Sequence, residues 1–255
     1  MNRYLVSAAV DIGVERESQE DFFQYKELDD DNLLCVIADG TGSRESYPQP
    51  AVIATSDIID HIERAFHSDK NTFMMNPLMF LNDAFLSANQ LIGAFKVANE
   101  EIFSGYAASV SAILLSNGNM LYCAHAGNTR VYLFRNGDVM QLTVDHTKAA
   151  ELLADGKIDY QTYHIHTDRL KMTSGIGLIA DPKIQLFSGA TLSNDLFVMT
   201  TDGIHYALQL EYIKQFVLNA ANEDEAAQSL ILAAKGDVKY PDNMSAAIIH
   251  AVSPT

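Results

Sequence analysis

The chain has 255 residues, of which 48% are apolar and 20% charged, values within the ordinary range for globular proteins. This composition argues against a disordered, collagen-like or membrane-spanning chain. The 33 acidic residues outnumber the 17 basic ones and give a net charge of −16, which argues against nucleic acid or an anionic membrane as partner, because both attract clustered cations.

Apolar runs rich in Val, Ile and Leu predict strands along the chain. In order they cover residues 5–12, 33–38, 107–115, 120–126, 130–134, 196–200 and 244–252. Three connections, at residues 116–119, 127–129 and 135–138, are rich in Asn and Gly and are typical of antiparallel hairpins. The middle of the chain is therefore predicted to be a meander of antiparallel strands.

Helical periodicity appears between these runs. It predicts helices over residues 51–66, 77–98, 210–220 and 224–235, with Pro77 in a first turn and Asn222 as an N-terminal cap. This order predicts an α+β fold in which antiparallel sheets are covered by helices. We find no repeat, low-complexity tract or linker, so residues 1–255 are interpreted as a single domain, and the weakly patterned residues 148–173 as a surface insertion or flap.

The two cysteines, Cys35 and Cys123, each lie inside an apolar run and are predicted to be buried thiols. The first residues form too short an apolar stretch for a secretory signal, and no segment approaches the roughly 18 consecutive apolar residues of a membrane span. We therefore expect a cytoplasmic protein.

Acidic residues occur at the borders of four predicted strands. Asp39-Gly40 and Asp202-Gly203 follow apolar runs, but no alternating strand follows either dipeptide, which makes a hairpin turn a poor explanation. Glu20-Asp21 stands ahead of a further run at residues 22–25, and Asp242-Asn243 stands just before the last predicted strand. Carboxylates gathered from distant segments suit Mg²⁺ or Mn²⁺, but the pattern alone also allows acids that merely keep strand ends soluble.

These residues carry a resemblance to a known family. Residues 11–21 match the pattern Asp-x-Gly-x-x-Arg-x-x-Asn-Glu-Asp except that Gln19 replaces the Asn, and residues 36–40 match an apolar run ending in Ala-Asp-Gly. Residues 127–130 and 142–146 match Gly-Asp-Ser-Arg and Leu-Thr-x-Asp-His with Asn128 in place of the Asp, and residues 201–203 and 242–245 match the last two motifs. In this order the chain resembles the metal-dependent serine/threonine protein phosphatases of type 2C, the PPM family.

The resemblance implies a four-layer α-β-β-α sandwich of two antiparallel sheets flanked by helices. It implies that one metal ion is held by Asp39, Asp202 and Asp242, and a second by Glu20, Asp39 and the carbonyl of Gly40. Asp39 would then bridge two Mg²⁺ or Mn²⁺ ions, and Arg16 would bind the phosphate through its guanidinium fork.

Further residues are assigned by the same resemblance. Asp21 and Asn243 would support the ligands from behind. Asn128 stands where the family has an Asp implicated in a third metal site, and a neutral amide is a poorer ligand for a hard cation. Thr41 stands where some members have a candidate general acid, while His205 is interpreted as structural. Zinc binding by His164 and His166, as alternate residues of a strand, is not favoured because no third ligand lies at sensible spacing.

The function implied is hydrolysis of phosphoserine and phosphothreonine in proteins by water activated at a two-metal centre. The expected partners are a phosphorylated protein substrate and an opposing serine/threonine kinase in signalling, with the flap shaping substrate choice. Two alternatives stay open: a catalytically weak member that acts as a phosphoprotein-binding regulatory module, and a hydrolase of small phosphate esters.

Overall fold

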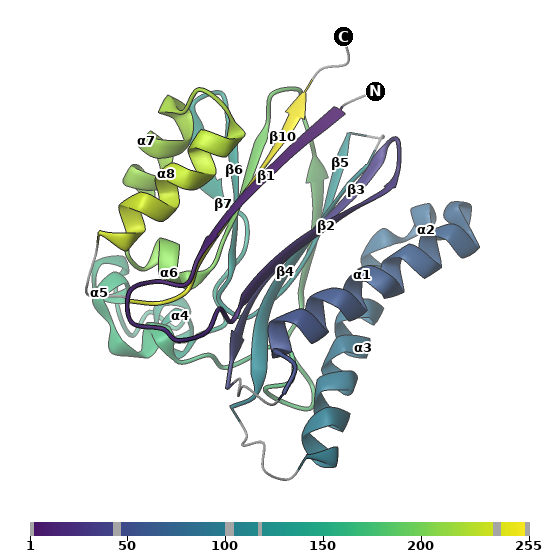
Figure 1. The fold of residues 1–255 in the computed structure, drawn as a ribbon, viewed down its shortest axis with the longest axis horizontal. Helices are drawn as coiled ribbons and strands as arrows, with labels where there is room; N and C mark the ends of the chain where they lie inside the picture. The colour runs from purple at the N-terminus through teal and green to yellow at the C-terminus, as the bar shows by residue number, and fades with distance from the viewer. Residues whose placement is uncertain (1–2, 43–46, 100–104, 117–118, 237–240, 253–255) are drawn as a thin grey trace.

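Ten antiparallel strands form two five-stranded sheets in the computed structural model, which describes residues 3–42, 47–99, 105–116, 119–236 and 241–252. The first sheet has the order β1 (Arg3–Asp11), β10 (Met244–Val252), β9 (Leu196–Thr200), β6 (Arg130–Arg135), β7 (Asp138–Gln141). The second has the order β2 (Asp21–Asp29), β3 (Asn32–Thr41), β4 (Ala107–Ser116), β5 (Met120–Ala126), β8 (Gln185–Ala190). The two sheets pack face to face, as Figure 1 shows.

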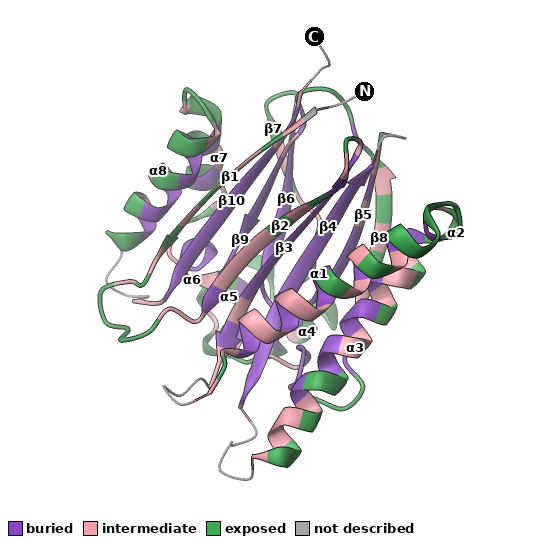
Figure 2. Ribbon diagram, turned by 45° about the vertical axis from the view of Figure 1, so that its right-hand side comes forward, coloured by how far each residue is buried: buried purple, intermediate pink, exposed green. Residues whose placement is uncertain are grey.

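Helices cover the outer faces of both sheets (Figures 1 and 2). The second sheet is covered by α1 (Pro50–Ser68), α2 (Lys70–Met75) and α3 (Pro77–Ala98), and the first by α7 (Leu210–Asn219) and α8 (Glu223–Lys235). The predicted four-layer α-β-β-α sandwich is confirmed. Pro77 opens α3, and the side chain of Asn222 accepts a hydrogen bond from the backbone N–H of Glu225, as expected of a cap.

The alternation of side chains along β3 explains its unbroken apolar run. Leu34 and Val36 face α1 and α3, whereas Leu33, Cys35 and Ile37 face the other sheet. A central strand between a helical layer and a second sheet has no face for polar residues, so both sets are apolar. Cys35 and Cys123 are buried free thiols, as predicted.

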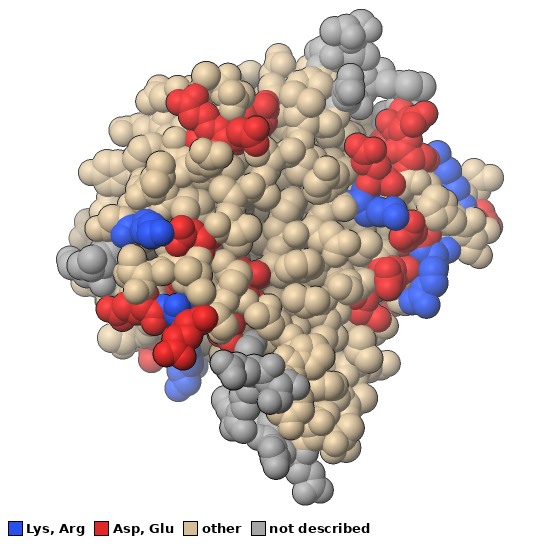
Figure 3. Space-filling model, viewed as in Figure 1, with Lys and Arg blue, Asp and Glu red and all other residues tan. Residues whose placement is uncertain are grey.

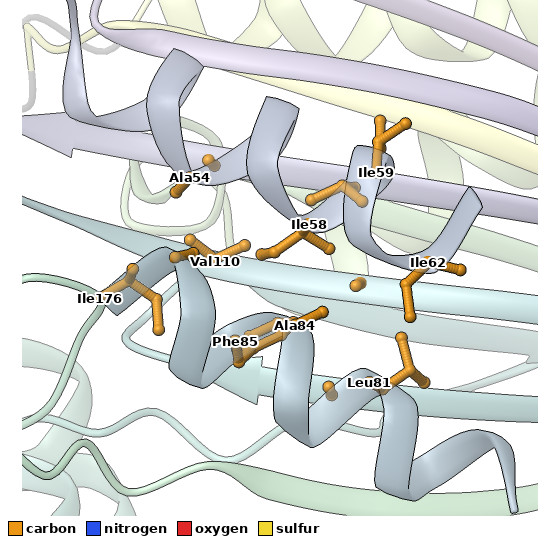
Figure 4. Close-up of a cluster of buried hydrophobic side chains, with 14 of the residues drawn as sticks. Ala54, Ile58, Ile59, Ile62, Leu81, Ala84, Phe85, Val110 and Ile176 are labelled. Atoms are coloured by element: carbon orange, nitrogen blue, oxygen red, sulfur yellow. The ribbon is translucent and has the colours of Figure 1, made fainter. Parts of the chain in front are cut away.

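The helical layer over the second sheet is held by branched and aromatic side chains. Ile58 and Ile62 of α1 lie against Leu81 and Phe85 of α3 above the sheet (Figure 4). The apolar residues of α1 recur every three or four positions and so form one face of the helix. This face, and not the intrinsic propensity of the chain, is what orients the helix.

One predicted connection is wrong. Residues 127–129 join β5 to β6, but these strands belong to different sheets, so the segment crosses between the layers and is not a hairpin. The turn at residues 135–138 does join paired strands, with Asn136 and Gly137 at φ of 55° and 80°, as a tight hairpin requires. Residues 117 and 118 of the third predicted hairpin lie outside the described residues.

The weakly patterned segment contains helices. It holds α4 (Lys148–Ala154), α5 (Tyr160–Ile165) and the 3-10 helix η1 (Thr167–Leu170), while α6 (Asp202–His205) is a single turn after β9. His164 and His166 therefore lie in α5 and at its C-terminal cap, so the interpretation of a shared strand face is wrong. Among the described residues, no helix is long and apolar enough to cross a membrane.

Candidate functional site

The strand borders that carry carboxylates converge at one end of the sandwich. Asp21 opens β2 and lies opposite Asp39 of β3 in the register of that pair. Asp202 begins α6 two residues after the end of β9, and Asp242 lies two residues before the start of β10, which pairs with β9. The prediction that Asp39 follows its strand is wrong. Asp39 lies inside β3, because this strand continues to Thr41 in pairing with β4.

Asp39 and Asp202 form the centre of this cluster and lie close enough for one of them, when protonated, to donate to the other. Burial, and then the negative charges of Asp202, Asp21 and Asp242, raise the pKa of Asp39 well above its usual value. Burial and the charge of Asp242 raise the pKa of Asp202 to about 6. Carboxylates placed this close stabilise any added positive charge, whether a proton or a cation.

Asp21 supports the cluster from behind. It is 3% exposed, and its Oδ2 accepts a hydrogen bond of 2.7 Å from Oγ1 of Thr201. The same Oγ1 accepts from the backbone N–H of Ser245 at 2.9 Å. Burial raises the pKa of Asp21 to about 8, against the lowering effect of the Thr201 hydrogen bond. Thr201, which the sequence analysis did not assign, therefore links Asp21 to β10.

Arg16 lies beside the same carboxylates. Its Nη2 is 2.8 Å from both oxygens of Asp242, and the charges of Glu20 and Asp202 are near enough to raise its pKa further. The side chain of Arg16 is 47% exposed, so part of it faces solvent at the mouth of the site. The predicted phosphate ligand and predicted metal ligands are thus brought together, with Arg16 paired to Asp242.

Asn243 holds the loop that carries Arg16 and Glu20. Its Nδ2 donates to the carbonyls of Ile12 and Ser18 at 2.8 and 3.0 Å, and its Oδ1 accepts from the backbone N–H of Glu20 at 2.7 Å. The carbonyl of Glu20 in turn accepts from the backbone N–H of Gly40 at 3.0 Å. A neutral side chain with both donors and an acceptor is required for this pattern, which Asp at this position does not supply.

Two glycines permit the close approach of these segments. A Cβ on Gly13, whose φ is +82°, would lie 2.2 Å from the carbonyl oxygen of Asp242, and a Cβ on Gly203 would lie 2.1 Å from that of Asn243. Any other residue would push the chain that carries Asp242 out of place. Both glycines fall in the motifs, but their packing role is visible only in three dimensions.

Asn128 lies at the site and presents a donor to it. Its Nδ2 donates to Oδ2 of Asp202 at 3.0 Å, and its backbone N–H donates to Oγ of Ser109 at 2.8 Å. His205 is buried, with Nδ1 2.8 Å from Oγ1 of Thr200, and burial lowers its pKa well below the usual value. A neutral, buried His205 agrees with the structural interpretation.

A buried polar cluster next to the site was not predicted from the sequence. Arg130 binds Asp145 through Nε and Nη2 at 2.9 and 2.7 Å, and the hydroxyl of Tyr163 donates to Oδ2 of Asp145 at 2.7 Å. Tyr206 lies four residues after Asp202, and its hydroxyl donates to the carbonyl of Arg169 at 2.6 Å. Arg130 and Asp145 stand in the quoted motifs, but Tyr163, Arg169 and Tyr206 carried no recognisable sequence signal.

A cavity of about 420 Å³ opens over the cluster. Its lining combines charged and apolar side chains and consists of Glu15, Arg16, Leu170, Asp202, Gly203, Tyr206, Pro241 and Asp242. On the face that Figure 3 shows, acidic groups lie in several patches, and basic groups stand beside most of them. The cavity presents a cationic group, Arg16, beside the carboxylates of Asp202 and Asp242.

The carboxylates of the cluster supply oxygen ligands, and such ligands suit a hard divalent cation. As the side chains stand, no group of three or more His, Cys, Asp or Glu within the described part of the chain is arranged to ligate a metal ion. Asp39 contacts Asp202, and Asp242 pairs with Arg16. Rotation of these carboxylates towards a common cation would relieve their mutual repulsion.

Comparisons with known proteins agree with this arrangement. The family model described as "Protein phosphatase 2C" matches residues 18–152, more than half of the chain. A putative protein phosphatase 2C-type of Streptococcus pyogenes is 26% identical over 247 residues, 96% of each chain. The serine/threonine protein phosphatase PstP of Mycobacterium tuberculosis is 28% identical over 221 residues, which are 86% of this chain and 40% of that protein.

Solved structures share the fold. The S. agalactiae serine/threonine phosphatase has a TM-score of 0.84 at 22% identity and covers 98% of this chain and 100% of its own. The catalytic domain of PstP, solved in complex with two manganese ions, has a TM-score of 0.81 at 22% identity and covers 99% of this chain and 100% of its own.

Proposed function

Because the chain belongs to the protein phosphatase 2C family and so to the phosphoprotein phosphatases, we propose that it hydrolyses phosphoserine and phosphothreonine in proteins at a two-metal centre. The observation that supports this most is the convergence of Asp39, Asp202 and Asp242 beside Arg16, under a cavity open to solvent. These residues come from distant parts of the chain. With Asp21 they make four carboxylates gathered at one point, and structural stability gives no reason for such a cluster.

The metal ligands proposed are those implied by the family resemblance. Asp39, Asp202 and Asp242 would hold one Mg²⁺ or Mn²⁺ ion, and Glu20, Asp39 and the carbonyl of Gly40 would hold the second. When bound, two such ions would lower the pKa of a coordinated water and offset charge that develops on the phosphoryl oxygens. The two manganese ions named for the PstP structure support this number and kind of ion.

The other residues bind and orient the substrate. The guanidinium of Arg16 leaves Asp242 and binds two phosphate oxygens through its fork. Asn243 keeps Arg16 and Glu20 in place through its hydrogen bonds with the loop that follows β1 and carries both residues. Thr41 offers no imidazole, so protonation of the leaving alkoxide falls to water or to another residue. Asn128 is neutral and donates to Asp202, which does not favour a third metal ion there.

The same proposal covers the rest of the chain. Residues 1–255 act as one phosphatase domain, with the helical segment within residues 148–173 as its flap. The substrate is a phosphorylated protein, and a serine/threonine kinase in the same signalling route opposes the enzyme. A cytoplasmic location stays a prediction.

The test is manganese-dependent release of phosphate from a phosphothreonine peptide. The wild type is compared with Asp202→Asn, which removes one charge from the centre of the cluster, and with Asp60→Asn, the same change at an exposed position of α1. We expect turnover that requires metal, that falls at least a hundredfold in Asp202→Asn, as when a main electrostatic contact is lost, and that is unchanged in Asp60→Asn.

Two outcomes would contradict the proposal. Turnover that persists without divalent metal, or in Asp202→Asn, would show that the chemistry lies elsewhere. If the wild type binds manganese, with an affinity that Asp202→Asn weakens, but releases no phosphate, the regulatory binding module becomes the better explanation.

A further inference from the structure

The catalytic cavity has an apolar side as well as a charged one. Arg16 and Asp242 form the charged side, whereas Leu170, Pro241 and the ring of Tyr206 also line it. Leu170 ends η1 and is 56% exposed, although Arg169 beside it is only 8% exposed. Of the described residues that line the cavity, Leu170 is the one supplied by the helical segment between β7 and β8.

Tyr206 fixes the position of Leu170. Its hydroxyl donates to the carbonyl of Arg169 at 2.6 Å, and the guanidinium of Arg169 lies 4.7 Å from the centre of its ring. The backbone N–H of Tyr206 donates to the carbonyl of Asp202 at 2.9 Å. The residue before Leu170 is therefore attached to the short helix that begins with Asp202.

A second attachment holds the same segment. The hydroxyl of Tyr163 in α5 donates to Asp145 and accepts from Nη2 of Arg130 at 3.1 Å. Arg169 also donates from Nη1 to the carbonyl of His164. α5 and α6 lie side by side in Figures 1 and 2. With two buried attachments, Leu170 is a fixed part of the cavity wall.

We propose that Leu170 is a specificity-determining residue that forms, with Pro241 and the ring of Tyr206, a subsite for an apolar side chain next to the phosphorylated residue, and that Tyr206 is the positioning residue of this subsite. The inference rests on the proposed function. At about 420 Å³ the cavity is near the lower end of the roughly 300 to 1,000 Å³ typical of ligand pockets, enough for a phosphorylated side chain and one neighbour.

Charge on the rim of the cavity also favours an apolar residue beside the phosphorylated one. Glu15 also lines the cavity, on a chain whose net charge is −16, whereas the charge of Asp242 is offset by Arg16. An acidic neighbour in the substrate would be repelled, while an apolar one would cover Leu170 and leave water. The class of substrate proposed is therefore a phosphoprotein segment with an aliphatic residue, and no acid, beside the phosphoresidue.

The test uses two phosphothreonine peptides of equal charge that differ only in the residues beside phosphothreonine, Leu in one and Gln in the other. For the wild type with manganese we expect kcat/KM to favour the Leu peptide about tenfold, chiefly through KM, the size of effect a single apolar contact gives. In Leu170→Ala the preference falls to about twofold, and in Leu170→Met it returns.

Two further variants test whether the hydroxyl of Tyr206 positions the subsite, and whether any exposed aliphatic side chain of the segment would have the same effect as Leu170. Tyr206→Phe keeps the ring and removes the hydroxyl, so we expect KM for the Leu peptide to rise about threefold to tenfold, as when one hydrogen bond is lost, with a smaller change in kcat. Ile165→Ala truncates another exposed aliphatic side chain of the segment, 81% exposed and outside the cavity lining, and leaves the preference at its wild-type value.

A small aryl phosphate, which carries no neighbouring residue, distinguishes two kinds of failure. If the wild type with manganese hydrolyses neither this ester nor the peptides, the proposed function itself fails. If the peptides are hydrolysed but have equal kcat/KM, or the preference survives in Leu170→Ala, the subsite is refuted and the proposed function stands. If only the ester is hydrolysed, both fail and a hydrolase of small phosphate esters becomes the better explanation.

Discussion

The buried ion pair between Arg130 and Asp145 provides the sharpest prediction for stability. The side chain of Asp145 is fully buried and that of Arg130 is 8% exposed. Both carboxylate oxygens are bound by the guanidinium, and one also accepts from Tyr163. Replacing Asp145 by Asn keeps the shape but removes the negative charge, which leaves the guanidinium buried without a counter-charge.

The expected cost follows from this geometry. Removing one partner of a buried ion pair destabilises a protein by about 3 to 5 kcal/mol, because the remaining charge loses its compensation. For a domain of this size each kcal/mol lowers the midpoint of thermal unfolding by roughly 2 to 4 °C. Asp145→Asn is thus expected to lower the midpoint by about 6 to 20 °C.

The effect of pH supplies an independent check. Burial alone would raise the pKa of Asp145, but the charge and hydrogen bonds of Arg130 outweigh it and hold the pKa at about 2, below the ordinary 3.8. A carboxyl with a lowered pKa stabilises the folded state above its ordinary pKa and loses that contribution as the pH falls through its folded value. The stability difference between wild type and Asp145→Asn should be constant from pH 7 to 5 and shrink between about pH 4 and 2.

The assay is calorimetric unfolding across this pH range. Asp155→Asn serves as the matched control, since the ion pair of Asp155 with Lys157 is exposed and its loss should leave the midpoint unchanged. The double variant Arg130→Met/Asp145→Leu should recover most of the loss, because it leaves no unpaired charge. A loss below 1 kcal/mol in Asp145→Asn, or one as large in the double variant, would refute the reasoning.

Two further predictions concern the loop glycines and the buried histidines. Gly13→Ala should destabilise the protein and raise the manganese concentration needed for half-maximal activity, because its Cβ would meet the carbonyl of Asp242. The control Gly137→Ala, at φ +80° with open space around it, should cost only about 1 to 2 kcal/mol of backbone strain. Equal metal dependence in the two variants would count against a role of Gly13 in placing Asp242. Burial, and then the charge of His146, lowers the pKa of His125 to about 3, so the folded state keeps a neutral ring that the unfolded chain protonates below about 6.5. Stability should therefore fall as the pH drops below 6.5, by up to about 1.4 kcal/mol per pH unit from this histidine, and the slope should be shallower in His125→Gln in denaturant titrations; an unchanged slope would contradict the assignment.

Local patterns predicted most elements but not their partners. The runs that became β3, β4 and β10 were recognisable because they are apolar on both faces, and α1 and α3 because one face is apolar. The strand β2 was indicated only by the run at residues 22–25, and the weaker strands β7 and β8 were missed, since these strands are short or partly exposed. The connection at residues 127–129 has the composition of a hairpin, and only the packing of the two sheets shows that it crosses between them.

The sequence by itself determined which residue types stand at the strand borders and, through ordered motifs, which carboxylates to expect at the site. Only the tertiary structure decided that Asp39 lies within β3, that Arg16 pairs with Asp242, and that Tyr206 attaches Leu170 to the cavity. The physical reason is one of distance along the chain. Periodicity and turn composition report burial and conformation within a few residues, whereas hydrogen bonds between residues 37 to 226 positions apart depend on how all four layers pack.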